Sequence, residues 1–131
     1  MMNKIMNQYI NSFLASFILA VSIFFASCGP TEKELAIQSG KETYLTYCAL
    51  CHGENGDGKG KLAIGKMPAP ANLTLTGLPD FAKREIIIKG GEAVGRSPFM
   101  PPWGQEFTEK QVDDLIVYLE TIKKVNLKYT K

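Results

Sequence analysis

The stretch YCALCHGENGDG, Tyr47 to Gly58, holds two of the chain's three cysteines and its one histidine. Cys48, Cys51 and His52 lie within five consecutive positions, and glycines follow at short intervals. Outside this stretch the chain has one further cysteine and no histidine. The stretch is therefore the first candidate for a functional site, and the segments on either side of it are interpreted from this point outward.

Two long loops are predicted on the C-terminal side of this stretch. Residues 53–73 contain five glycines and two prolines and follow neither the helical nor the strand period. Residues 90–104, GGEAVGRSPFMPPWG, form the second loop, in which Pro101 and Pro102 remove two backbone donors. Met100 precedes a proline and is expected to be extended. Loops of this length usually belong to a functional site or wrap around something.

Helices are predicted before and between these loops. An amphipathic helix from about Leu35 to Cys51 is indicated because four residues recur at helical spacing, namely Ile37, Gly40, Tyr44 and Cys48. A close backbone contact would explain a glycine at position 40, since glycine costs a helix about 1 kcal/mol relative to alanine. Residues 80–89, DFAKREIIIK, predict a short helix ending at Gly90, although the three isoleucines are equally compatible with a strand.

The last predicted helix has the clearest signals. Thr108 and Gln111 have the spacing of a capping box, and Phe107 and Val112 that of a hydrophobic staple. The helix should end near Lys124, with an apolar face made of Val112, Leu115, Ile116, Leu119 and Ile122. These helices alone offer a thin core, so we expect a large apolar group that is not part of the amino-acid sequence.

The N-terminal segment indicates export. Residues 13–26 are an apolar run without a charge, which suits a signal peptide better than a spanning helix of about 20 residues. The sequence Phe25-Ala26-Ser27-Cys28 resembles the lipobox of bacterial lipoproteins, in which the cysteine is lipidated and becomes the mature N-terminus. The alternatives are a secretory cleavage that leaves Cys28 as a free thiol, or an uncleaved anchor. The expected product is a membrane-anchored lipoprotein that faces the periplasm or the cell exterior.

These observations predict four segments. They are a signal peptide at 1–27, a lipidated tether at 28–36, a domain at 37–124 and a C-terminal tail at 125–131. The formal net charge is +2 and the charges are interspersed, so there is no dense basic surface for nucleic acid.

The sequence from Cys48 to His52 has the CxxCH spacing of covalent haem attachment. Two thiols one helical turn apart can add to the two vinyl groups of a porphyrin, and the adjacent histidine can bind the iron. A thioredoxin-like site would be expected beside a βαβ pattern, and a structural zinc site needs four ligands. No βαβ pattern is present, and the fourth possible zinc ligand, Cys28, lies twenty residues upstream of Cys48 and has its own explanation. One covalent haem c is therefore predicted.

At this point the chain resembles the class I monohaem cytochromes c, from about Ile37 to Ile122. Gly40, Tyr44 and Cys48 match the first helix of that family, and residues 115–119, LIVYL, look like the partner helix that crosses it. The resemblance implies an all-α cytochrome c fold of three or more helices, with long loops wrapped around one haem. Tyr44 and Tyr118 are then expected to serve packing alone.

The resemblance also implies the residues around the haem. Met100, within the sequence MPPWG, looks like the sixth ligand to the iron, and Met67 is the alternative. The carbonyl of Pro70 would accept the hydrogen bond from His52, with Pro68 as the second candidate. Trp103 is expected to pack near the haem edge.

With both axial positions filled, the iron suits outer-sphere electron transfer. The resemblance therefore implies an electron carrier that is not an enzyme, placed between a redox donor and an acceptor such as a terminal oxidase. One alternative is a gas sensor or peroxidase-like module in which Met100 dissociates. The other is a haem subunit of a larger oxidoreductase complex, which the sequence cannot distinguish from a free carrier.

Overall fold

The structure, a computed structural model, describes residues 2, 4–7, 9–14 and 29–124. The chain divides into two compact units, Met1–Thr31 and Glu32–Lys131. In the first unit the described residues 4–7 and 9–14 are helical and exposed. The predicted lipidation site at Cys28 and the tail at 125–131 lie outside the described residues. Within the described part of the chain, no helix combines the length and the apolar character needed to cross a membrane.

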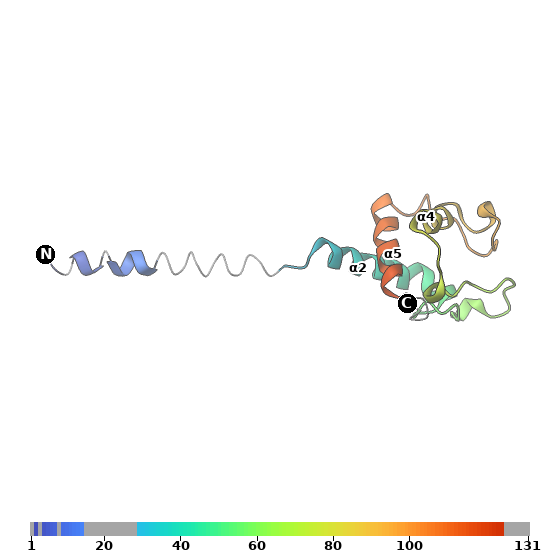
Figure 1. The fold of residues 1–131 in the computed structure, drawn as a ribbon, viewed down its shortest axis with the longest axis horizontal. Coiled ribbons are helices and arrows are strands. Elements are labelled where there is room, and N and C mark those ends of the chain that lie inside the picture. Colours follow the sequence, from blue (N-terminus) through green and yellow to red (C-terminus); the bar gives the residue numbers. More distant parts are fainter. Residues whose placement is uncertain (1, 3, 8, 15–28, 125–131) are drawn as a thin grey trace, which may run out of the picture. The chain divides into compact units, whose positions relative to one another are not determined.

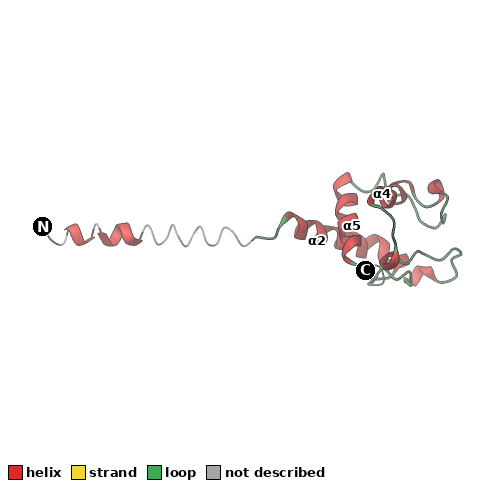
Figure 2. Ribbon diagram, in the orientation of Figure 1, coloured by secondary structure: helices red, strands yellow, loops and turns green. Residues whose placement is uncertain are grey.

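The second unit is helical, and the described residues contain no strand (Figure 2). The prediction of an all-α fold is therefore confirmed. Its elements are α2 (Glu32–Thr43), the π-helical turn η1 (Tyr44–Cys48), α3 (Ala49–His52), the 3-10 turns η2 (Lys61–Ala63) and η3 (Leu73–Leu75), α4 (Asp80–Lys89), the 3-10 turn η4 (Glu92–Val94) and α5 (Glu109–Thr121).

The first predicted helix is present, but it is longer than predicted and not uniform. It begins at Glu32, so residues 32–36, which the sequence assigns to the tether, belong to α2. The π-helical turn η1 follows, and the backbone N–H of Ala49 reaches back five residues to the Tyr44 carbonyl. A π turn shifts the helix register relative to a regular 3.6-residue repeat. The cysteine motif therefore starts in a register that the apolar periodicity alone does not predict.

The helices α2 and α5 cross (Figure 1). Gly40 of α2 lies at their contact. A Cβ added at Gly40 would lie 2.6 Å from the carbonyl carbon of Asp114 and 2.8 Å from the Cβ of Tyr118. The predicted close contact of this glycine with the last helix is therefore confirmed. Beside it, the rings of Tyr44 and Tyr118 pack with their centroids 5.3 Å apart, and both side chains are buried.

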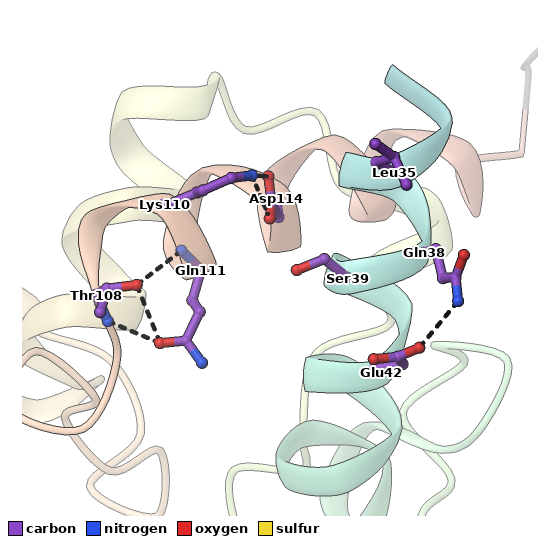
Figure 3. Close-up of a pocket in the computed structure, with 8 residues that line it drawn as sticks. All are labelled: Leu35, Gln38, Ser39, Glu42, Thr108, Lys110, Gln111 and Asp114. Carbon is purple, nitrogen blue, oxygen red and sulfur yellow. Dashed lines mark hydrogen bonds and ion pairs between the residues drawn. The ribbon is translucent and has the colours of Figure 1, made fainter. Parts of the chain in front are cut away.

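The capping box predicted for the last helix is present (Figure 3). The Thr108 side chain accepts from the Gln111 backbone, and the Gln111 side chain accepts from the Thr108 backbone. The helix ends at Thr121 instead of near Lys124. The reason is that the chain turns toward the preceding loop, where the N–H of Lys124 donates to the carbonyl of Thr74 at 2.9 Å.

The short helix predicted at residues 80–89 is also confirmed, as α4, and Gly90 is its C-cap. Ion pairs join it to α5. Lys83 is buried and pairs with Asp80 and with Glu120, and Arg84 pairs with Asp113. Burial alone would lower the pKa of Lys83, but hydrogen bonds to its two carboxylate partners outweigh burial and raise it. This ammonium group therefore stays charged inside the contact between α4 and α5.

The apolar core gathers around α5, whose inner face supplies most of it. Its buried side chains are Tyr44, Ile87, Phe107, Val112, Leu115, Ile116, Tyr118 and Leu119. The two long loops, drawn green and orange in Figure 1, both extend away from α5 on the same side of this view. The helical core is thus compact, and the glycine- and proline-rich loops extend beyond it.

Candidate cofactor site

The two cysteines of the CxxCH motif lie on consecutive turns of one helical segment. Cys48 ends η1 and Cys51 lies in α3, and both thiols are free. Burial, followed by the neighbouring Cys51, raises the pKa of the Cys48 thiol to about 12. A protonated thiol is a poor nucleophile for disulfide exchange, so this environment does not match that of a thioredoxin-like redox pair. The described residues also contain no strand on which a βαβ unit could be built.

The imidazole of His52 is fixed by a backbone carbonyl. Its Nδ1 lies 2.9 Å from the carbonyl oxygen of Ala71. A carbonyl oxygen can only accept, so Nδ1 carries the proton and Nε2 keeps its lone pair. Burial lowers the pKa of His52, and the hydrogen bond to Ala71 opposes this shift. The ring is thus presented as a neutral imidazole with one oriented nitrogen donor, which is the form that binds metals.

The acceptor for His52 corrects the sequence interpretation, which expected the carbonyl of Pro70 or Pro68. The carbonyl of Pro70 instead faces Gly58, where an added Cβ would lie 2.6 Å from its oxygen. The side chain of Asn72 is also engaged, because it accepts from the backbone N–H of Thr74 and starts η3. Ala71, which stands between Pro70 and Asn72 in the sequence, therefore brings its carbonyl to the imidazole, one position later than predicted.

The glycines after the motif cover the C-terminal end of its helix. The backbone N–H groups of Gly53, Gly58 and Gly60 donate to the carbonyls of residues 49, 52 and 51, respectively, at 2.8 to 3.1 Å. Helix ends leave such carbonyls without partners inside the helix. At Gly60 the approach is so close that an added Cβ would lie 2.6 Å from the carbonyl carbons of Leu50 and Cys51. The glycines are needed because this loop folds directly against the helix end that carries His52.

The loop with the sequence MPPWG is docked on the C-terminal end of α4. The backbone N–H of Trp103 donates to Ile87 at 2.9 Å, and that of Gly104 donates to Ile88 at 3.1 Å. At the start of the loop, the N–H of Gly91 donates to the carbonyl of Met100 at 2.9 Å. Three backbone bonds thus fix Met100 and its neighbours to the end of α4.

The two methionines of residues 29–124 differ in exposure. Met100 is partly buried, whereas Met67 is 82% exposed. A thioether that is held by a bonded loop and already partly covered is the better prepared ligand of the two. This difference favours Met100 over Met67.

An aromatic cluster lies next to the cysteine motif. Trp103 and Phe107 stack with their centroids 5.0 Å apart and their planes within 3°. Tyr47 meets Trp103 edge-on at 5.3 Å and Phe107 at 5.1 Å. Trp103 is thus packed beside the residue that precedes Cys48. Sequence reasoning singled out Trp103 but assigned Tyr47 no contact, because Tyr47 is not one of the residues that recur at helical spacing. Its side chain remains 47% exposed beside the two rings.

The residues present fit a covalently bound haem. They provide two free thiols at the attachment spacing, one imidazole whose Nε2 is available and one partly covered thioether. Among the described residues, no group of three or more His, Cys, Asp or Glu side chains could hold a metal ion. Thiols, an imidazole and a thioether are the groups by which c-type cytochromes attach and ligate haem. The pocket drawn in Figure 3 lies between α2 and α5 and is lined by none of these residues.

Comparisons with known proteins identify relatives of this domain. Residues 35–119 match the family described as cytochrome C oxidase, cbb3-type, subunit III. The cbb3-type cytochrome c oxidase subunit FixP of Azorhizobium caulinodans is 33% identical over 87 residues, which cover 66% of this chain and 27% of that protein. The cbb3-type cytochrome c oxidase subunit CcoP of Azospirillum brasilense is 31% identical over 87 residues, which cover 66% of this chain and 28% of that protein. The chain therefore spans little more than a quarter of the length of these curated relatives.

A solved structure is similar as well. A chain of the reducing HAO-like protein complex of Kuenenia stuttgartiensis superposes with a TM-score of 0.55 and 30% sequence identity. The match covers 72% of this chain and 43% of that chain.

Proposed function

Because the chain belongs to the cbb3-type cytochrome c oxidase subunit III family, we propose that it is a lipid-anchored electron carrier with one His/Met-ligated haem. Membership of this family implies a covalently bound haem c and a c-type cytochrome role in electron transfer. The remaining elements of the proposal concern the ligands, the anchor and the partners.

Cys48 and Cys51 are the proposed attachment points, and His52 is the proposed axial ligand. The observation that carries this assignment is the hydrogen bond from Nδ1 of His52 to the Ala71 carbonyl at 2.9 Å. It fixes the tautomer, leaves Nε2 available and strengthens the nitrogen as a donor. Pro70 belongs to the same loop and supports this geometry through its contact with Gly58.

Met100 is the proposed second axial ligand. Its backbone bond to Gly91 and its partial burial support this role. When bound, the haem supplies a one-electron couple, and methionine ligation raises its reduction potential relative to a second histidine. Trp103, stacked on Phe107, is proposed to cover the haem edge. With both axial positions taken by the chain's own side chains, no site is left open for a substrate, so the protein is proposed to act as a carrier and not as an enzyme.

The anchor and the partners follow from the sequence and the relatives. Cys28, the first residue after the proposed signal peptide, is the proposed lipidation site, and it would hold the domain on a membrane facing the periplasm or the cell exterior. The two curated relatives are named as oxidase subunits. We therefore propose redox proteins as donor and acceptor, a terminal oxidase among them.

Substitution of the proposed methionine ligand tests the central part of the proposal. The oxidised protein should show the far-red sulfur-to-iron charge-transfer band, and Met100→Ala should abolish it. Met67→Ala is the matched control and should leave the band unchanged. A band that persists in Met100→Ala and is lost in Met67→Ala would assign the ligand to Met67. Rapid carbon monoxide binding by the reduced wild type would favour a gas sensor.

Two further measurements test the cofactor and the anchor. The purified protein should exceed its polypeptide mass by one haem, and replacing Cys48 and Cys51 by alanine should remove that mass. Labelling with palmitate should mark the wild type and not Cys28→Ala.

A haem subunit of a larger complex is the second candidate function, because both curated relatives are named as subunits of an oxidase. Gentle solubilisation of native membranes followed by size-exclusion chromatography separates the two candidates. Elution of the haem protein at its own mass supports a free carrier, and co-elution with an oxidase supports a subunit.

A further inference from the structure

The two long loops touch through one charged contact. The Nζ atom of Lys66 lies over the ring of Phe99, 4.3 Å from its centroid. Lys66 belongs to the loop that follows His52, and Phe99 belongs to the loop that carries Met100. A cation at this distance from an aromatic face is attracted by the ring quadrupole. The two loops are therefore joined at residues directly next to the two methionines.

The burial pattern around Lys66 is the reverse of what hydrophobicity predicts. Ile64 is 88% exposed and Met67 is 82% exposed, whereas Lys66 between them is partly buried. None of the ion pairs found among the described residues involves Lys66. The lysine is thus turned inward toward the Phe99 ring and not toward an acidic side chain.

The backbones of Phe99 and Met100 are both hydrogen-bonded to Ser97. The backbone N–H of Phe99 donates to the Ser97 hydroxyl at 3.3 Å, and the N–H of Met100 donates to the Ser97 carbonyl at 3.2 Å. The Met100 carbonyl in turn accepts from Gly91. A displacement that withdraws Met100 therefore carries the Phe99 ring with it and breaks its contact with Lys66.

We propose that Lys66 and Phe99 are positioning residues that latch the two loops together and slow the withdrawal of Met100 from the iron. This inference rests on the proposed role of Met100 as a ligand. The lysine contributes through its charge over the ring, and the phenylalanine through its π face and its place beside the ligand.

A double-mutant cycle tests the latch. Imidazole binds the oxidised iron only after the sixth ligand has withdrawn, so its binding rate reports the opening of the Met100 loop. Lys66→Gln and Phe99→Leu should each raise this rate about two- to fivefold, the range expected for an exposed cation–π contact. The imidazole binding rate of the double variant should be no higher than that of either single variant, because both substitutions remove the same contact. Lys66→Arg keeps the positive charge and should therefore keep the slow wild-type rate. Lys61→Gln, in the same loop, is the control and should leave the wild-type rate unchanged.

Hydrogen exchange provides a second readout that does not depend on iron ligation. Exchange at residues 97–100 should accelerate in Lys66→Gln and not in Lys61→Gln. Additive effects of Lys66→Gln and Phe99→Leu on the imidazole binding rate would contradict the proposed latch. Equal hydrogen exchange at residues 97–100 in Lys66→Gln and Lys61→Gln would also contradict it. If the wild type lacks the charge-transfer band while Lys66→Gln still accelerates exchange, the latch stands as a loop contact and the assignment of Met100 as ligand fails.

Discussion

Replacing Gly40 by alanine should loosen the crossing of α2 and α5, because this glycine has no room for a side chain. The added Cβ would lie 2.6 Å from the Asp114 carbonyl carbon and 2.8 Å from the Tyr118 Cβ. Neither atom can rotate away, since both are fixed to the backbone of α5. The two helices would have to separate, and overpacking of this kind costs about 1 to 3 kcal/mol.

The helix propensity of alanine works in the opposite direction. Alanine favours a helix over glycine by about 1 kcal/mol. Because both obstructing atoms are rigid, we take the upper end of the packing cost, about 3 kcal/mol. The free energy of unfolding should then fall by about 2 kcal/mol, which lowers the melting temperature of a domain of roughly 100 residues by about 10 °C.

Thermal and urea unfolding of the haem-containing protein, followed by circular dichroism of the helices, measure this change. Gly77→Ala is the matched control, because an added Cβ there meets nothing within 4 Å. Its unfolding free energy should stay within about 0.5 kcal/mol of the wild type. A Gly40→Ala protein as stable as the wild type would refute the close crossing.

Three further predictions concern the helices. Thr108→Ala removes the N-cap of α5 and should lower the free energy of unfolding by about 1 kcal/mol in a urea titration. Thr108→Ser keeps a capping hydroxyl and should retain most of that stability. Lys83→Met should lower the free energy of unfolding by about 1 kcal/mol in the same urea titration. The loss stays small because Asp80, which is 67% exposed, returns to water, and Glu120, which is 42% exposed, keeps its ion pair with Lys123. Hydrogen bonds from Lys123 and then Lys83 hold the pKa of Glu120 below its ordinary value of 4.5, so stability should be lost as pH falls from that value through the folded-state pKa. Urea titrations across this range should show a shallower acid dependence in Lys83→Met, and an identical dependence would contradict the pairing.

Local signals account for the parts of the fold that the sequence predicted well. The capping box at Thr108 and Gln111, and the glycine that ends α4, act within a few residues of chain and are readable from residue type. A glycine inside a helix predicted a close backbone contact at Gly40, and the resemblance to the class I cytochromes c implied that the last helix is the partner. The caps and the close approach at Gly40 thus depend on a side chain or on its absence, whereas the partner of Gly40 was implied by the resemblance.

The features that escaped prediction are set by the backbone or by long-range contacts. Any residue has a carbonyl, so residue type did not reveal that Ala71, and not Pro70, faces His52. The π turn before Ala49 leaves no mark in an apolar period. The contact of Lys66 with Phe99 joins residues 33 positions apart, and neither residue type requires the other.

The docking of residues 103 and 104 on α4 makes the helix end and the methionine loop one cooperative unit. The carbonyls of Ile87 and Ile88 accept from Trp103 and Gly104, so the last turn of α4 and the loop share the same hydrogen bonds. Neither can fray without the other, and their amides should exchange with a common protection factor. Each sub-global opening would expose them together, so if Met100 binds the iron as proposed, its residence time would depend on the melting of the last turn of α4.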